Sequence, residues 1–384
     1  MAKTIRNQFD KKLTYESLMK AHYESRKNKS CKKDIILFNL KQEEYIKYLY
    51  DELKTQKYKH GKYQIFYVHE PKLRKIQKSR YIDRIVHRWL VDNFLYDAFV
   101  KQFIYSSYAC IKGKGMHNSA IDIQKSMKHC QRIWNEYYIL KMDVRKYFQN
   151  INKKILYSII MRKIKDEKLL WLIREVIFST DGENEEVGIA IGNYTSQVFA
   201  NIYLNEVDQY IKHDLHIKYY FRYMDDSIIL VHTKEEAKIA LERIKKFLKE
   251  KLGLELNSKT QIFKNKQGVN FCGYKINEYR MKIRNRGKKK LKKKVKALKI
   301  KIKEGKMTSK EAQKYLCGHL GYIKYANNYN LINKLFIRDK SKAQLLRGGS
   351  FNNAYASNPA CYREYNYAPN TNTNNGFRPV LYIK

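Results

Sequence analysis

Three strand-like segments of the chain carry aspartates at their ends, and aspartates at such positions can hold metal ions. The motif Tyr223-Met224-Asp225-Asp226 joins the strand-like residues 218–223 and 227–231, and Asp143 lies near the end of a third run, residues 138–144. At a hairpin tip, neighbouring carboxylates repel each other unless a cation compensates. If the strands lie side by side, three carboxylates converge in the arrangement that holds two Mg²⁺ ions roughly 3.5–4 Å apart for in-line phosphoryl transfer.

The other residue types of the chain agree with such an oxygen-ligand site. Magnesium prefers carboxylate oxygens and needs neither histidine nor cysteine. The six cysteines, at positions 31, 110, 130, 272, 317 and 361, are scattered and form no pair or cluster with zinc spacing. We therefore expect free thiols in a reducing compartment and two Mg²⁺ ions, which Mn²⁺ can replace, as the metal cofactors.

The charge of the chain predicts a polyanionic partner. There are 79 lysines and arginines against 37 aspartates and glutamates, a formal net charge of +42, and 33 tyrosines accompany them. Basic surfaces interleaved with aromatic rings suit nucleic acid. A membrane surface is the weaker alternative, because no stretch approaches the roughly 20 apolar residues that span a bilayer. Since the N-terminus also lacks the apolar core of a signal peptide, we expect a soluble cytoplasmic protein that does not bind membranes.

Helical and strand patterns follow one another with few prolines between them. Further strands are expected at residues 63–68, 255–257 and 269–276, and helices at residues 13–23, 193–211, 234–252 and 309–335. From Lys288 onward, apolar residues recur every three or four positions with lysines between them, which predicts a helix with one apolar face and a basic outer surface. That surface is either simply solvated or binds phosphates.

Six blocks occur in the order typical of reverse transcriptases, and the chain resembles that family over roughly residues 60 to 335. The blocks are PKLRKIQKSRYIDRIVH (71–87), KMDVRKYFQNI (141–151), GIAIGNYTSQVFANIYL (188–204), YMDD (223–226), LNSKT (256–260) and FCGY (271–274). The resemblance implies an α+β right-hand polymerase fold with fingers, a palm containing an antiparallel sheet, and a helical thumb. It implies an RNA-directed DNA polymerase that uses an RNA template, a DNA or RNA primer and deoxynucleoside triphosphates. An RNA-binding module with this fold is the non-enzymatic alternative.

The resemblance also assigns roles to single residues. Asp143, Asp225 and Asp226 are the implied metal ligands. Lys72 and Arg74 match positions that grip the incoming triphosphate, Phe148 matches a ring that excludes a 2′-hydroxyl, and Lys259 matches a lysine that protonates pyrophosphate. The alternatives are a solvated basic turn, a core aromatic and an exposed lysine, respectively. Three further groups are the neighbours of the nascent base pair (Ile191, Gly192, Gln197), the primer grip (Phe271, Cys272, Gly273, Tyr274) and thumb lysines on nucleic acid (Lys289, Lys293, Lys296).

The third block points to a subfamily. Many relatives carry PQG before this helix and SP within it, whereas this chain has Ile191 in place of the glutamine and Gln197 in place of the proline. IGNxTSQ, SYACIKGKGMH (107–117) and CGHLGYIKYANNYNL (317–331) resemble the reverse transcriptases of diversity-generating retroelements. Those enzymes copy a template repeat with frequent errors at adenines, the mutated DNA replaces part of a target gene by retrohoming, and a small basic helical accessory protein assists. Retron-like and abortive-infection phage-defence enzymes share parts of the pattern and are the alternative.

The predicted domains are a basic N-terminal extension (1–34), fingers (35–135), a palm (136–280, with finger elements around 150–187), a helical thumb (281–345) and an asparagine-rich tail (346–384). The tail carries RGGSFNN and NNGFRPV, which resemble the end of a lectin-like variable segment. It is an in-frame template repeat, a lectin-like remnant or a disordered segment, and we favour the first because the tail is too short for a complete lectin-like domain. No ribonuclease H acidic set and no maturase-sized extension follow residue 335, which disfavours a group II intron protein.

Overall fold

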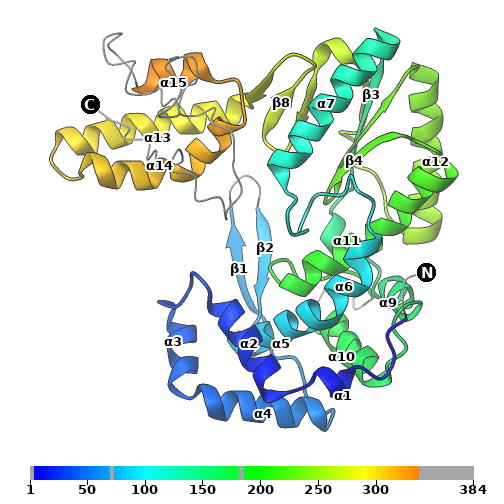
Figure 1. Ribbon diagram of the computed structural model, residues 1–384, viewed down its shortest axis with the longest axis vertical. Coiled ribbons are helices and arrows are strands. Elements are labelled where there is room, and N and C mark those ends of the chain that lie inside the picture. Colours follow the sequence, from blue (N-terminus) through cyan, green and yellow to red (C-terminus); the bar gives the residue numbers. More distant parts are fainter. Residues whose placement is uncertain (1–3, 70–72, 181–185, 337–384) are drawn as a thin grey trace, which may run out of the picture. The chain divides into compact units, whose positions relative to one another are not determined.

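The computed structural model describes residues 4–69, 73–180 and 186–336 (Figure 1). Within them the chain forms two compact units. The first unit contains the residues up to Gly115 together with Tyr138–Phe263, and the second contains Met116–Tyr137 together with the residues from Lys264 onward. This division into two compact units does not test the predicted boundaries of fingers, palm and thumb, which stay a prediction. Lys72 and the tail lie outside the described residues.

The first unit begins with helices and a hairpin. The helices are α1 (Phe9–Lys12), α2 (Tyr15–Arg26), α3 (Lys33–Leu40), α4 (Gln42–Lys54), α5 (Tyr81–Leu90), the π-helix η1 (Val91–Leu95), α6 (Tyr96–Phe99) and the short 3₁₀ helix η2 (Val100–Gln102). Between α4 and α5, strands β1 (Gln64–Val68) and β2 (Arg74–Lys78) pair antiparallel, from Gln64 opposite Lys78 to Val68 opposite Arg74. The β1–β2 hairpin confirms the strand predicted at residues 63–68 and adds its partner.

A four-stranded sheet follows, in the order β4–β5–β3–β6. Its strands are β3 (Tyr138–Asp143), β4 (Tyr219–Tyr223), β5 (Asp226–Val231) and β6 (Gln261–Lys264). Side chains alternate between the faces of a strand, and the core cluster includes Leu140, Met142 and Ile229 from one face, packed with Ile244 and Leu248 of α12 (Lys234–Leu252). The opposite face is the one on which Asp143 lies.

The bounds of α12 follow from its sequence. The Thr233 side chain accepts from the Glu236 N–H while the Glu236 side chain accepts from the Thr233 backbone, which satisfies donors at the helix start. Gly253 ends the helix at φ +61°, a conformation that suits glycine. Both signals stand in the sequence, and the predicted range 234–252 is confirmed.

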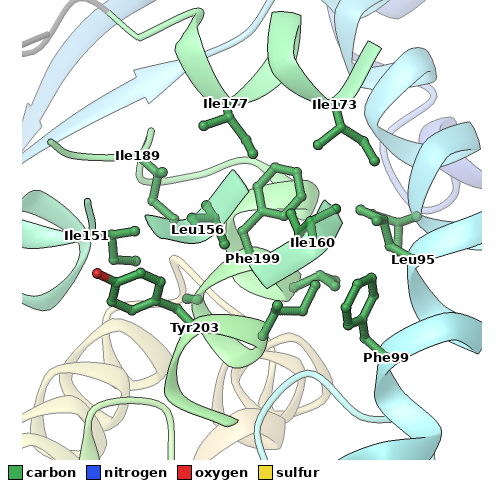
Figure 2. Packing of buried hydrophobic residues seen from close by; sticks show 14 of the residues in the cluster. Leu95, Phe99, Ile151, Leu156, Ile160, Ile173, Ile177, Ile189, Phe199 and Tyr203 are labelled. Carbon is green, nitrogen blue, oxygen red and sulfur yellow. The ribbon is translucent and has the colours of Figure 1, made fainter. Parts of the chain in front are cut away.

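The remaining helices of the first unit surround a buried apolar cluster (Figure 2). They are α8 (Tyr147–Asn150), α9 (Lys153–Met161), α10 (Glu167–Phe178), α11 (Tyr194–Gln209) and the π-helix η3 (Tyr210–Asp214). Phe199 and Tyr203 of α11 lie in this cluster with Ile160 of α9 and Ile173 of α10. Because α11 is buried around most of its circumference, it is a fixed support for the loop before it and for the strands beside it.

The second unit consists of α7 (Met116–Trp134), the 3₁₀ helix η4 (Asn265–Gln267), strands β7 (Val269–Phe271), β8 (Tyr274–Ile276) and β9 (Met281–Ile283), and helices α13 (Asn285–Lys303), α14 (Ser309–Lys324) and α15 (Tyr329–Phe336). The three strands form an antiparallel sheet. The lysine-rich helix predicted after Lys288 is confirmed as α13, with Leu291, Val295 and Leu298 buried.

Three sequence predictions are corrected. The helix expected at residues 309–335 is two helices, α14 and α15, separated by residues 325–328. The single strand expected at residues 269–276 is a hairpin, because Cys272 and Gly273 take φ +45° and +86° and reverse the chain. The strand expected at residues 255–257 is only an isolated bridge from Leu256 to Val144. No helix within the described residues is long and apolar enough to span a bilayer. The cysteines at positions 31, 110, 130, 272 and 317 form no disulfide within the described residues.

Candidate active site

The antiparallel register of β3 and β5 brings the predicted aspartates together. Asp143, the last residue of β3, is directly opposite Asp226, the first residue of β5. Directly opposed side chains point to the same face, so both carboxylates lie on the sheet face away from α12. Asp225 precedes β5 in the turn, where its carbonyl accepts a 3.3 Å hydrogen bond from the Val144 N–H. Met224, before it, takes the left-handed φ of +53°.

Burial and mutual repulsion raise the pKa of both aspartates in the YMDD turn. For Asp225, burial is the main cause of the raised pKa and the charge of Asp143 adds to it. Burial raises the pKa of Asp226 to about 6, although Lys141 lowers it in part. Lys141 Nζ lies 3.4 Å from Asp226 Oδ1. That buried oxygen accepts no well-formed hydrogen bond within the described chain, so its charge is incompletely compensated.

Asp143 is held by the loop after α12. Asn257 Nδ2 donates to Asp143 Oδ2 over 3.0 Å, and the Asn257 backbone N–H donates to the Asp143 carbonyl over 2.7 Å. Sequence analysis assigned a role in this loop only to Lys259, whose side chain is exposed and whose backbone N–H donates to Asn257 Oδ1 over 3.1 Å. Asn257 is thus a site residue that sequence reasoning missed, although it lies in the LNSKT block.

The carboxylates have the chemistry that magnesium requires, and the raised pKa values are those of groups that a cation would stabilise. Among the described residues, however, no three acidic, histidine or cysteine side chains are arranged as a ready-made metal site. Lys141 stands beside Asp226, and Asn257 engages one oxygen of Asp143. Asp143 and Asp225 are therefore the residues that would hold an ion first, and the two-ion site with Asp226 stays a prediction.

Arg74 is close enough to act on this site. It is the first residue of β2, and its charge is among the causes that lower the pKa of Asp225 against the effect of burial. A cation in this position can bind an anionic ligand at the same place. Its predicted companion, Lys72, lies outside the described residues.

The β1–β2 hairpin is fastened to the loop that carries Ile191 and Gly192. The Gln77 N–H of β2 donates to the Ile191 carbonyl over 3.2 Å. Gly192 takes φ +125°, and a Cβ there would stand 3.4 Å from Ile76 Cγ2. Residues with a side chain rarely adopt this backbone conformation, so glycine suits the position. The Ile191 side chain is half-buried and brings no polar atom to the loop.

Phe148 lies half-buried on α8, five residues after Asp143. Its carbonyl accepts a 2.9 Å hydrogen bond from the Ile189 N–H, and its ring meets Tyr147 edge-on with centroids 5.6 Å apart. Gly188 takes φ +92° and approaches the α8 backbone closely. The loop before α11 therefore packs on α8, so that the ring of Phe148 has a defined place.

The side chain of Gln197 contacts Cys110. Cys110 belongs to SYACIKGKGMH, the segment that shares the subfamily resemblance with IGNxTSQ. Gln197 Oε1 accepts a 3.3 Å hydrogen bond from the Cys110 thiol, whose pKa burial raises. One turn later, Asn201 Nδ2 donates to the Ala109 carbonyl over 2.8 Å. The segments SYAC and IGNxTSQ thus meet in the first unit, and the predicted contact of Gln197 with nucleotide stays a prediction.

A buried charged network supports the YMDD turn and was not predicted. The Arg222 guanidinium donates to both Asp208 oxygens, with Nε to Oδ1 at 2.7 Å and Nη2 to Oδ2 at 2.6 Å. Its Nη1 donates to Asn201 Oδ1 at 3.0 Å and to the Met224 carbonyl at 3.2 Å. Tyr220 Oη donates to Asp208 Oδ1 at 2.7 Å. The guanidinium therefore connects α11 to the turn between β4 and β5.

In the second unit, the predicted primer-grip residues form the β7–β8 turn. Phe271 and Tyr274 pair across the hairpin and are fully buried, while Cys272 and Gly273 reverse the chain. A Cβ on Gly273 would stand 2.8 Å from the Tyr322 ring. The predicted thumb lysines, Lys289, Lys293 and Lys296, are all exposed on α13. The structure thus describes every predicted site residue except Lys72.

The antiparallel sheet presents aspartates beside a cationic hairpin, and comparison with known proteins gives the family of the chain. The family described as "Reverse transcriptase (RNA-dependent DNA polymerase)" matches residues 59–276. The match covers more than half of the chain, so this protein belongs to the reverse transcriptase family. The predicted family and its α+β right-hand polymerase fold are confirmed.

Three curated relatives are similar to the chain. It is 22% identical to the putative COX1/OXI3 intron 2 protein of Saccharomyces cerevisiae, over 45% of this chain and 27% of that protein. It is 23% identical to protein YkfC of Escherichia coli, over 53% and 63%, and 25% identical to the retron Ec73 reverse transcriptase of Escherichia coli, over 44% and 52%. The chain spans less than two thirds of the length of each.

Among solved structures, the chain resembles apo telomerase from Candida tropicalis truncated from its C-terminal domain. The TM-score is 0.43 at 15% identity, over 58% of this chain and 55% of that one.

Proposed function

We propose that this protein is an RNA-directed DNA polymerase that extends a primer along an RNA template. The observation that carries the proposal is the strand register that sets Asp143 opposite Asp226, with Asp225 in the adjoining turn, in a chain of the reverse transcriptase family. When bound, magnesium would supply the charge neutralisation that phosphoryl transfer requires. The first ligands would be Asp143 and Asp225.

The residues around the aspartates would bind and orient the nucleotide. Arg74, whose charge already acts on Asp225, would bind the triphosphate oxygens. The ring of Phe148, which meets Tyr147 edge-on, would pack against the sugar and exclude a 2′-hydroxyl. Lys259, exposed beside Asn257, would hold a proton for the departing pyrophosphate.

The test is primer extension on a primed RNA template with an Asp225→Asn variant. We expect DNA synthesis to fall by at least a hundred-fold, because one ion ligand is lost, while RNA affinity changes little. Asp97→Asn is the matched control, since Asp97 is exposed and forms a surface ion pair with Lys101, four residues later. If purified wild type stays inert in Mg²⁺ and Mn²⁺ with candidate accessory proteins present, an RNA-binding module becomes the better description.

We further propose that the polymerase is the adenine-mutagenic enzyme of a diversity-generating retroelement. The support is Ile191, which brings an aliphatic side chain where many relatives place a glutamine. This side chain cannot donate a hydrogen bond to the nascent base pair. The loss of one such bond reduces the free-energy difference between correct and incorrect nucleotides by about 1 kcal/mol, which raises the error rate several-fold. A retron-like defence enzyme is the second candidate, favoured by the 25% identity to a retron reverse transcriptase.

Sequencing the cDNA made on an adenine-containing RNA template decides between these candidates. We expect wild-type errors to concentrate opposite adenines and to decrease several-fold in Ile191→Gln, because the amide restores a polar contact. Ile239→Gln, at an exposed position on α12, is the matched control and should keep the wild-type error pattern. A uniformly accurate wild-type product would contradict the retroelement assignment and favour the retron-like one.

A cytoplasmic location, retrohoming into a target gene and a small basic helical accessory protein belong to the same proposal. Adding such an accessory protein should raise cDNA yield on the natural template. An unchanged cDNA yield would contradict the proposal that such an accessory protein is a partner.

A further inference from the structure

The second unit contains an elongated hollow that the polymerase proposal does not use. One part, of about 670 Å³, lies between the β8–β9 turn, the start of α13 and the segment Asn327–Leu331 that leads into α15. A second part, of about 430 Å³, extends along β8 and β9 to Lys275 and Asn277. The two parts share Tyr279, Arg280 and Lys282 in their walls. The two parts adjoin along these residues, and we call them together the β8–β9 groove.

Hydrogen bonds fix the walls of the β8–β9 groove. Asn277 Oδ1 accepts from the backbone N–H groups of Tyr279 and Arg280, at 3.1 and 2.6 Å, and so sets the β8–β9 turn. Met281 of β9 and Asn327 exchange two hydrogen bonds, of 2.9 and 2.6 Å, which tie the α15 side to the strand. Figure 1 shows α15 beside α13, and Lys299 Nζ of α13 donates to the Leu335 carbonyl at 3.0 Å. The groove is thus held open by the fold.

The charge of the β8–β9 groove is of one sign. Its larger part is lined by Arg280, Lys282, Lys288, Lys292 and Lys334, and by no carboxylate. None of these five cations forms an ion pair with the residues that the structure describes. Elsewhere many exposed lysines do, such as Lys59 with Glu175 and Lys264 with Glu136. Five uncompensated cations around one hollow repel one another, so a polyanion in the groove would relieve that repulsion.

Two tyrosine rings and an asparagine amide indicate which class of ligand the β8–β9 groove can bind. Tyr279 is 76% exposed and Tyr329 is 43% exposed, so both rings present part of their surface to solvent. Asn328 lines the groove and is buried, yet its Nδ2 donates to no group in the described chain. Cations that follow a track, with exposed rings beside them, are the combination that binds single-stranded nucleic acid. An elongated track suits a chain of phosphates better than one compact anion.

We propose that the β8–β9 groove binds a single-stranded polynucleotide, with phosphates on Arg280, Lys282 and Lys288 and a base stacked on Tyr279. Two of these three cations, Arg280 and Lys282, come from the β8–β9 hairpin, whereas Lys289, Lys293 and Lys296, which we assign to duplex, come from α13. The inference does not depend on polymerase activity.

The experiment measures fluorescence anisotropy of labelled single-stranded 12-nucleotide RNA and DNA, and of an RNA–DNA hybrid, across salt concentrations. In a variant with Arg280, Lys282 and Lys288 each changed to Gln, we expect the log–log salt slope for single strands to shrink by about 2, since each phosphate contact contributes roughly 0.7. Hybrid binding should change less than two-fold. The matched control changes Lys238, Lys246 and Lys249 of α12, all exposed, to Gln and should leave the single-strand slope unchanged.

A second variant tests the contribution of base stacking on Tyr279 separately from that of the cations. Tyr279→Ala, at an exposed position that does not threaten folding, should weaken the single strand roughly ten-fold and leave an abasic strand of the same length unaffected. The RNA and DNA arms identify which strand the groove prefers. Equal losses in the groove and control variants, or equal losses on single strand and hybrid, would overturn the proposal. Primer extension by wild type in parallel shows whether the polymerase proposal stands, whichever way binding turns out.

Discussion

Lys141 places a positive charge 3.4 Å from Asp226 and still leaves the pKa of that carboxyl raised to about 6. The ammonium group of Lys141 therefore compensates only part of the negative charge of Asp226. A bound metal ion would compensate the same charge better, so metal affinity should increase as pH rises and the carboxylates lose their protons. Protonation of Asp226 thus affects both the stability of the fold and the affinity of this site for metal.

The first prediction at this scale concerns stability and pH. Because the folded pKa of Asp226 lies above the ordinary value near 3.8, the folded protein binds this proton more tightly than the unfolded chain, and stability falls as pH rises from about 4 to about 6. Asp226→Asn removes this effect. Relative to wild type without divalent ions, the variant should gain about 1 kcal/mol in unfolding free energy between pH 4 and 7.5, a figure reduced for the partial exposure of the side chain.

Urea unfolding at several pH values measures this gain. Asp97→Asn, at an exposed position, should show no such change between pH 4 and 7.5. A pH-independent difference between Asp226→Asn and wild type would mean that Asp226 is adequately compensated by Lys141.

At the scale of elements, the Arg222–Asp208 pair joins α11 to the β4–β5 hairpin. Breaking a buried pair by removing one partner leaves a buried charge and costs about 3–5 kcal/mol. Arg222→Met should therefore destabilise strongly. The double variant Arg222→Met/Asp208→Asn should recover at least 1 kcal/mol, because no charge is left alone and the amide oxygen still accepts from Tyr220.

The double variant also separates stability from positioning. It lacks the hydrogen bond to the Met224 carbonyl, so the aspartates of the turn should be less well placed. We expect DNA synthesis to stay at least ten-fold below wild type at saturating nucleotide while RNA binding is normal. Recovery of full synthesis together with stability would show that the pair serves folding alone.

Elements with local signals were predicted from the sequence, and contacts between distant segments were not. The strand that ends at Asp143 and the strand that begins at Asp226 are short runs rich in apolar and β-branched residues, and α12 has both of its caps in the sequence. The Arg222 network depends on α11, 14 and 21 residues away along the chain. Its only local signal is an arginine at a core-facing position of a strand. The turn at Cys272 was missed because a left-handed cysteine has no characteristic pattern.

At the scale of the whole molecule, a net charge of +42 makes nucleic-acid binding dependent on salt. Affinity for an RNA–DNA hybrid should fall by orders of magnitude between low and moderate salt through counterion release. Changing Lys289, Lys293 and Lys296 to Gln should reduce the log–log slope by roughly 2 to 3. The triple change at Lys238, Lys246 and Lys249 has the same net charge and should alter the slope much less. Equal slopes in both variants would mean that only total charge matters.

The isolated bridge between Ser107 and Arg222 has a consequence for synthesis of the chain. The Arg222 N–H donates to the Ser106 carbonyl, and the Tyr108 N–H donates to the Arg222 carbonyl, so residues 106–108 cover the outer edge of β4. Uncovered strand edges recruit other chains. The covering segment leaves the ribosome more than a hundred residues before β4 does. When the apolar strand emerges, the segment that shields it from neighbouring nascent chains has therefore already been made.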